Sequence, residues 1–158
     1  MPLKYPVPEA ISEQIGQAAY QRWLNRIASA HVRRDRKRGN AGAKREGYMI
    51  SIHAAVVSSR GRDAYTGEDL RWDLLSTYDN LESAGGGRTY KAKFALQPSV
   101  DHVGDGLGPA EFRICAWRTN QAKSDLTLEN FVELCRRVVS FHERGDRRKQ
   151  SSGLDLEP

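Results

Sequence analysis

The chain contains very little cysteine and no long apolar segment. Cys115 and Cys135 are the only cysteines among its 158 residues, and no CxxC pair is present. This argues against a disulfide framework and a four-cysteine zinc site, and it fits a reducing compartment. No apolar run approaches a membrane span, and the first residues, MPLKYPVPEA, lack the apolar core of a signal peptide. We therefore expect a cytoplasmic protein without a membrane partner.

The positive charge is concentrated in one short segment. The formal net charge is +5, and residues 31–45, HVRRDRKRGNAGAKR, hold seven Lys and Arg but a single acid, Asp35. The rest of the chain has 18 basic and 19 acidic residues. Such a cluster is typical of phosphate binding, although a solvated linker has the same composition. The candidate DNA-binding residues in it are Arg33, Arg34, Arg36, Lys37 and Arg38.

Apolar periodicity predicts two helices in the first half of the chain. Residues 9–30 repeat apolar side chains every four positions, which favours a helix ending before the basic segment. Residues 46–58 favour a second helix, although their Ile and Val also fit a strand. Residues 60–75 are typical of a turn with a short hairpin or loop, and Gly85 to Gly87 predict a loop over 82–93.

The second half predicts two strands followed by helices. FALQPSVDHV (94–103) and FRICAWR (112–118) favour strands joined by a glycine-rich loop, and TNQAKSD begins a short helix near Asn120. A last helix is predicted over 127–143, with Thr127 as its cap. Its expected buried stripe consists of Phe131, Leu134, Val138 and Phe141.

The domain organisation expected from this pattern is simple. Residues 1–145 are predicted to form a single α+β domain, in which helices flank the two strands. The charged tail, residues 146–158, is predicted to be disordered.

An Asp-His pair ends the first predicted strand. In SVDHVGDGLG, Asp101 and His102 precede three glycines, and Asn120 follows the second strand. Two antiparallel strands followed by a helix bring these three side chains to one edge. Carboxylate and amide oxygens suit Mg²⁺ or a similar ion, and a neutral imidazole takes a proton from water. The glycines would let a phosphate backbone approach closely.

These residues resemble the HNH endonucleases, also called the His-Me finger or ββα-metal family. VDHV matches the family's Asp-His element, and ICAWRTNQAKSDL resembles its closing segment, with Asn120 and Lys123 in register. YTGEDL (65–70) resembles the turn before the core, so the likeness covers residues 62–126. The resemblance implies that His102 is the general base, that Asp101 and Asn120 hold Mg²⁺ or Mn²⁺, and that Lys123 and Arg118 contact phosphate.

The sequence departs from the family pattern at two places. The family's middle Asn falls at Glu111, so a carboxylate would accept the imidazole N–H there. Many members of the family carry two CxxC pairs that bind a structural zinc. This chain has no CxxC pair, so no structural zinc is expected. The equivalent positions are Asp63, Thr66, Ala116 and Thr119, and packing of Trp72, Trp117 and Tyr65 is expected to replace the metal.

We therefore expect a metal-dependent DNA endonuclease with an HNH-like core flanked by N- and C-terminal helices. Glu111 favours an alternative, a nucleic-acid-binding protein of the same fold that has lost catalysis. A further alternative is an interaction or dimerisation module that ignores nucleic acid. The sequence leaves the oligomeric state open.

Overall fold

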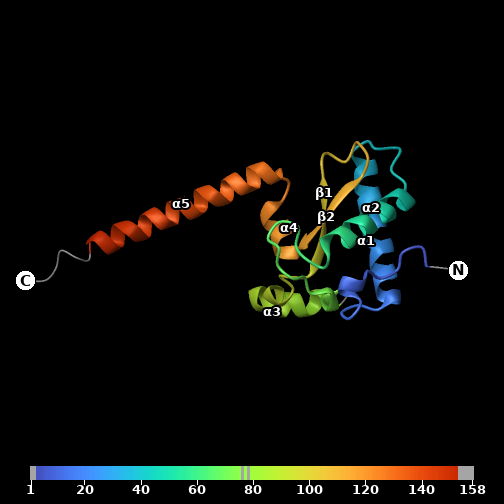
Figure 1. Ribbon diagram of the computed structural model, residues 1–158, viewed down its shortest axis with the longest axis horizontal. Coiled ribbons are helices and arrows are strands. Elements are labelled where there is room, and N and C mark those ends of the chain that lie inside the picture. The colour runs from blue at the N-terminus through green and yellow to red at the C-terminus, as the bar shows by residue number, and fades with distance from the viewer. Residues whose placement is uncertain (1–2, 76, 78, 153–158) are drawn as a thin grey trace, which may run out of the picture. The chain divides into compact units, whose positions relative to one another are not determined.

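The structure is a computed structural model that describes residues 3–75, 77 and 79–152, and it shows a mixed α+β protein (Figure 1). Its helices and strands are α1 (Gln17–Lys37), α2 (Arg45–Ser59), α3 (Asn80–Lys93), β1 (Pro98–Val103), β2 (Glu111–Ala116), α4 (Trp117–Lys123) and α5 (Leu128–Ser152), with 3₁₀ turns η1 (Glu9–Ile11) and η2 (Trp72–Leu74). β1 and β2 form an antiparallel two-stranded sheet. The expected α+β class is confirmed, as is the helix over 46–58. Both predicted strands are present, but β1 begins at Pro98 and not at residue 94, and residues 117–118 belong to α4.

The chain divides at residue 123 into two compact units, residues 1–122 and 123–158. The first unit contains α1, α2, α3, the hairpin and nearly all of α4, and the second contains α5. The division falls inside the segment that the sequence predicts as one domain.

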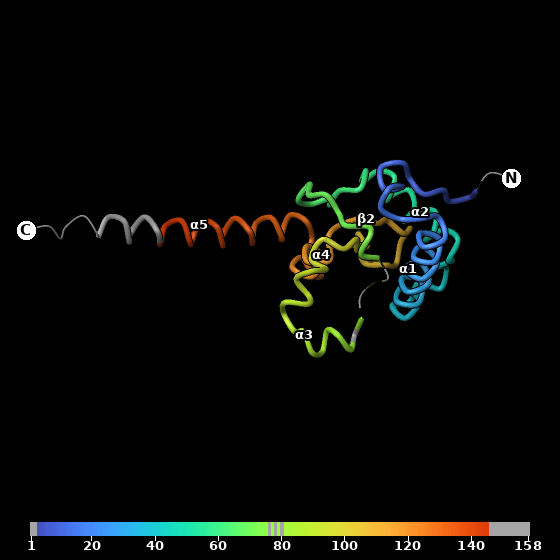
Figure 2. The backbone as a smooth tube through the Cα atoms, turned by 90° about the horizontal axis from the view of Figure 1, so that it is seen from below, coloured from blue at the N-terminus to red at the C-terminus, as the bar shows by residue number. Residues whose placement is uncertain are grey.

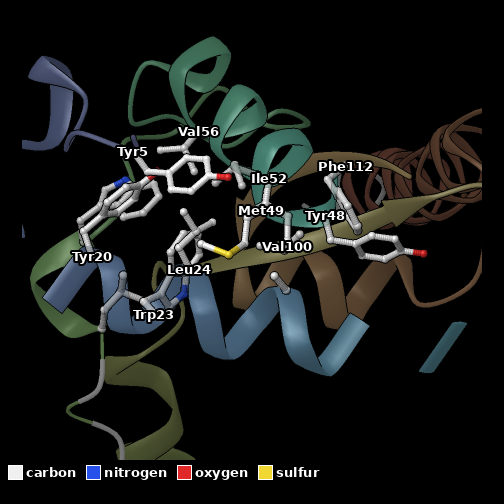
Figure 3. Close-up of a cluster of buried hydrophobic side chains, with 14 of the residues drawn as sticks. Tyr5, Tyr20, Trp23, Leu24, Tyr48, Met49, Ile52, Val56, Val100 and Phe112 are labelled. Atoms are coloured by element: carbon white, nitrogen blue, oxygen red, sulfur yellow. The ribbon is translucent and has the colours of Figure 1, made fainter. Parts of the chain in front are cut away.

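The core of the first unit lies between α1, α2 and the hairpin. α1 and α2 lie side by side, and α2 packs on β2 (Figures 1 and 2). Large side chains fill this space from all three elements (Figure 3). Trp23, Leu24, Ile52 and Val56 are at most 1% exposed. Burial of each such side chain contributes roughly 1.5–3 kcal/mol relative to leaving it in water.

The first long helix differs from its prediction at both ends. α1 begins only at Gln17, after Gly16 in extended conformation, and it runs to Lys37 through the first half of the basic segment. Its buried face continues through Val32 to Asp35, so the four-residue pattern persists beyond residue 30. Gly39, with φ +108°, follows the helix end. The prediction that the helix ends at residue 30 is therefore wrong.

The glycine triplet lies in a helix and not in a loop. Asp79 caps α3 because its side chain accepts from the backbone N–H groups of Leu81 (2.7 Å) and Glu82 (3.1 Å). The glycines interrupt the helix only at Gly87, which has φ 51°. The loop prediction for 82–93 is wrong because the cap and the residues after the triplet sustain helical structure.

The last helix is longer and more exposed than predicted. Thr127 Oγ1 accepts from the N–H of Asn130 at 3.2 Å, which confirms the cap. α5 is assigned as far as Ser152, and residues 153–158 lie outside the described residues, so disorder of the tail 146–158 stays a prediction. Leu134, Val138 and Phe141 are 46%, 51% and 67% exposed. The predicted stripe is therefore apolar but not buried.

Among the described residues, no helix combines the length and the apolar character that crossing a membrane requires.

Candidate functional site

The hairpin and α4 form a continuous strand–strand–helix unit. β1 pairs with β2 so that Asp101 lies opposite Arg113 and His102 opposite Phe112, and α4 follows β2 directly. Because side chains alternate along a strand, Asp101 and His102 leave opposite faces of the sheet. The two faces therefore carry different parts of the predicted site.

One face, here named the Asp101 face, carries Ser99, Asp101 and Glu111. The Tyr65 hydroxyl donates to Asp101, which is 6% exposed. Asn120 of α4 donates from Nδ2 to Ser99 Oγ at 2.8 Å, two residues before Asp101. Two of the three predicted partners, Asp101 and Asn120, thus lie toward the same side of the hairpin.

His102 points to the other face, into the core beneath α1. Its Nε2 lies 2.9 Å from Oδ2 of Asp35, and the two side chains are 5% and 0% exposed. The ring also packs on His31 and Phe112, at centroid distances of 6.1 and 5.1 Å. The structure therefore places the predicted general base in a buried polar cluster, on the opposite face from Asp101.

Asp35 is held as a buried carboxylate by several donors. Tyr48 Oη donates to Asp35 Oδ2 at 2.6 Å, and Arg34 Nε lies 3.3 Å from Oδ1. Burial alone would raise the pKa of Asp35, but the Tyr48 hydrogen bond, the His102 charge and Arg34 together hold this pKa below its ordinary value. Burial, together with the same hydrogen bond, raises the pKa of Tyr48 to about 12.

The glycine-rich loop after β1 makes room for Asp35. Gly106 has φ +82°, and a Cβ on it would lie 2.7 Å from Asp35 Oδ1. Asn40 Nδ2 donates to the Gly106 carbonyl at 2.9 Å, which ties the loop to the end of α1. The close approach that the sequence assigns to a phosphate is thus made at Gly106 by a carboxylate of the protein itself.

The carboxylate beside His102 comes from α1 and not from β2. Glu111 is exposed and lies opposite Val103 in the register, on the Asp101 face. The expectation that Glu111 accepts the imidazole N–H is therefore wrong, since Asp35 occupies that place. The only available signal was that Asp35 is the single acid in a basic segment.

The basic residues of α1 separate into outward and inward groups. An open groove of about 490 Å³ is lined by Ser29, Val32, Arg33, Arg36, Lys37 and Arg45. Arg34 turns inward to Asp35, and its Nη2 is buried without a hydrogen-bond partner among the described residues. Arg38 is exposed after the helix end.

The two residues of α4 that are predicted to contact phosphate are less accessible to solvent than the basic residues of the groove. Lys123 is only 6% exposed. Arg118 is half-exposed and pairs with Glu68 of the YTGEDL turn. Neither side chain is exposed and unpaired with a carboxylate among the described residues, as Arg33 and Lys37 are.

Asp63 is one of the four positions at which the sequence resemblance places zinc ligands. Its Oδ1 accepts from the N–H groups of Tyr65 (2.7 Å) and Thr66 (3.1 Å), and its Oδ2 accepts from the N–H of Ala116 (2.8 Å). Asp63 is 2% exposed, and its bond to Ala116 is buried while the two within the turn are partly buried, so all three are made to a largely desolvated charged acceptor. A carboxylate therefore links the turn to β2, and the fully buried Trp72 packs edge-on against Trp23 at 5.4 Å.

The Asp101 face has two oxygen donors that suit a hard divalent ion. Asn120 uses its amide nitrogen for Ser99, which leaves the amide oxygen to act as a ligand. No group of three or more His, Cys, Asp or Glu in the described part of the chain is arranged to hold a metal ion. Mg²⁺ commonly binds through one or two protein oxygens with waters and substrate phosphates, but Asp101 is 6% exposed and already accepts from the Tyr65 hydroxyl.

Comparison with protein families, with characterised proteins and with solved structures finds no match to this chain.

Proposed function

We propose that this chain binds duplex DNA through phosphate contacts in the basic groove of α1, on a strand–strand–helix scaffold of HNH type. The observation that carries the proposal is the gathering of Arg33, Arg36, Lys37 and Arg45 around one open groove. Nucleic-acid backbones are bound mainly by such clustered cations, which release condensed counterions on binding.

The groove cations are available for a polyanion. Arg33, Lys37 and Arg45 are exposed, and no carboxylate of the described residues pairs with them. Arg36 donates from Nε to the Ala43 carbonyl at 3.0 Å, which fixes the loop between α1 and α2. Their position on a rigid helix next to the core gives the phosphates a preformed surface.

Fluorescence anisotropy with a labelled duplex tests this proposal. We expect binding that weakens steeply with salt, and in the double variant Arg33→Ala/Lys37→Ala a salt slope reduced by about 0.9 per lost phosphate contact. Arg88→Ala, which removes an exposed cation from α3, is the matched control and leaves the slope unchanged. Equal loss in both variants, or no binding at low salt, contradicts the proposal.

A second candidate function is metal-dependent hydrolysis of DNA, and one observation favours it. Asp101 and Asn120 lie toward the same face of the hairpin, as an HNH-type metal pair requires. A bound divalent cation would stabilise the negative charge that develops on the phosphate. Asp101 and Asn120 would hold that ion, and His102 would take the proton of the attacking water. The burial of His102 beside Asp35 favours DNA binding without cleavage as the leading proposal.

Cleavage of supercoiled plasmid with Mg²⁺ or Mn²⁺ separates the two functions. An endonuclease gives cleavage that EDTA abolishes and that is lost in His102→Ala but kept in His142→Ala, which removes an exposed histidine of α5. Binding of the plasmid without cleavage by the unmutated chain supports the binding function alone.

A further inference from the structure

We propose that α1 lies in the major groove of duplex DNA, and that Arg22 and Arg26 extend its phosphate-binding surface beyond the basic groove. These two residues belong to a line of exposed cations, here named the cation row, which consists of Arg22, Arg26, Arg33, Arg36 and Lys37. The inference rests on the DNA-binding proposal above. It adds two contact residues and the placement of the helix on the duplex.

The cation row follows the axis of α1. With the rotation and rise of an α-helix, its five positions fall within an arc of about 100° and extend over about 22 Å from Arg22 to Lys37. All five side chains are exposed. The opposite side of the helix, with Trp23 and Leu24, turns into the core (Figure 3). The row therefore continues the wall of the basic groove along the solvent side of the whole helix.

The rest of this face consists of small side chains. The other positions of α1 that fall within the same arc are Ala18, Ala19 and Ser29. Ala18 and Ser29 are exposed, and Ala19 is half-buried. Between the long cations there is thus no side chain larger than serine. A large ligand can therefore approach the helix backbone closely while the arginines and the lysine reach out on both sides of it.

No acid balances the cation row. Asp35 is the single acid of α1, and it is fully buried on the core side. Within the described part of the chain, no carboxylate forms an ion pair with Arg22 or Arg26. Both guanidinium groups are therefore available to an anion that comes from outside the protein.

The spacing of these cations does not serve the helix itself. Arg22 and Arg26 are four residues apart, as are Arg33 and Lys37, and like charges at this spacing destabilise a helix. On α5 the same spacing carries an ion pair of opposite charges. Because the row opposes the folding of α1 and pairs with no acid on it, its charges point to an anionic ligand.

The dimensions of the row fit the major groove of duplex DNA. An α-helix with its side chains is about 10–12 Å across, which a major groove of about 12 Å admits and a minor groove of about 6 Å excludes. A straight helix laid across one strand meets phosphates only near the crossing, because the strand winds around the duplex axis. In the major groove, phosphates flank the helix along its length. The row then extends over about six base pairs, at about 3.4 Å each.

Fluorescence anisotropy over a series of salt concentrations tests the two new contacts. We expect Arg22→Ala/Arg26→Ala to reduce the salt slope by about 0.9 for each lost phosphate contact. Arg22→Lys/Arg26→Lys keeps the slope, because lysine retains the charge. Arg88→Ala/Arg136→Ala is the matched control, since it removes the same charge from exposed arginines of α3 and α5, and it leaves the slope unchanged.

Competition with groove-binding ligands tests the placement of α1. Methyl green occupies the major groove and netropsin the minor groove of A·T-rich DNA, and both are cationic. On a labelled A·T-rich duplex saturated with one ligand, we expect methyl green to abolish binding of the unmutated chain and netropsin to leave it unchanged. The two ligands thus separate occupancy of a particular groove from general neutralisation of phosphate charge.

The outcomes distinguish this inference from the proposal on which it rests. Absence of binding by the unmutated chain at low salt contradicts the DNA-binding proposal, and this inference with it. Binding with an unchanged slope in Arg22→Ala/Arg26→Ala, or with an equal reduction in the control variant, overturns the contribution of the two arginines alone. Loss of binding with netropsin, with both ligands or with neither overturns the placement in the major groove.

Discussion

Tyr48 of α2 donates its hydroxyl hydrogen to the buried carboxylate of Asp35 on α1, at 2.6 Å. This bond joins the two helices that cover the core face of the hairpin, and it is made to a group that is 0% exposed. Hydrogen bonds to charged groups are stronger than those between neutral groups, and an unmatched buried charge is costly. Removal of this single hydroxyl is therefore expected to lower the free energy of unfolding.

Tyr48→Phe is expected to lower the free energy of unfolding by about 2 kcal/mol, because Asp35 loses one of its donors while the aromatic ring stays in place. Tyr20→Phe is the matched control. It removes a buried hydroxyl whose partner is Nδ1 of His53 at 2.7 Å, and it should cost about 1 kcal/mol. Urea unfolding of both variants gives the comparison. A larger loss in Tyr20→Phe would contradict a charged Asp35.

His31 is expected to make the stability depend on pH between about 4 and 6.5. Burial lowers its pKa to about 4, with help from Arg34 and His102 and against the pull of Asp35 and Asp101. In the unfolded chain His31 binds a proton below about pH 6.5, whereas in the folded chain it binds this proton only below about pH 4. Stability therefore falls as the pH drops through this window, by about 2–3 kcal/mol in total.

Urea midpoints measured from pH 7 to pH 4 check this expectation. His31→Gln removes the titrating group and should flatten the dependence in that window. An unmutated chain and a His31→Gln variant with parallel pH profiles would assign the dependence to other groups.

Asp63→Asn is expected to destabilise the turn at residues 63–68 by about 2–3 kcal/mol. The amide oxygen can still accept from Tyr65 and Thr66, but the amide nitrogen then faces the N–H of Ala116, and two donors meet in a buried place. Asp69→Asn is the control, because Asp69 forms an exposed ion pair with Arg62 at 3.2 Å that contributes about 0–1 kcal/mol. Faster amide hydrogen exchange at Ala116 in Asp63→Asn, and not in Asp69→Asn, is the expected signature.

Truncation in the exposed apolar stripe of α5 is expected to lower the free energy of unfolding much less than truncation in the core. Leu134 is 46% exposed, whereas Ile52 lies in the core at 0%. Ile52→Ala is expected to cost about 2–5 kcal/mol. Leu134→Ala should change the value by less than about 0.5 kcal/mol. Unfolding followed through the fluorescence of Trp23 and Trp72 reports on the first unit, and equal losses in the two variants would contradict the observed exposure.

Local sequence patterns predict the hairpin and α2 well because both are regular and bury one face. The alternation through Val100 and Ile114 marks the core side of the strands, and the turn of chain after β2 places Asn120 near β1, as expected. The periodicity of α1 extends to Asp35, but a charged residue in a basic run indicates solvent and not core. Tyr48 and His102, which lie apart from it in the sequence, and the neighbouring Arg34 make that position tolerable.

The orientation of the His102 side chain is not predicted from the sequence either, because it depends on residues that are distant along the chain. Its neighbour Asp101 and the motif around it suggest a shared catalytic edge, whereas pleating and the approach of Asp35 send the ring to the core. The helix α3 is not predicted, because Gly85 to Gly87 taken one by one favour a loop more strongly than Asp79 favours the start of a helix. In α5, helical spacing predicts an apolar face but carries no information on what covers it.

The three hydrogen bonds of Asp63 bear on what this corner of the molecule needs in order to form. All three are made between groups of the chain itself, two within the turn at 63–68 and one to β2. A corner held by a captured ion must instead wait for delivery of that ion and is lost to any stronger chelator. Expression in metal-limited medium and refolding in the presence of chelators should therefore give this corner of the protein its full native structure.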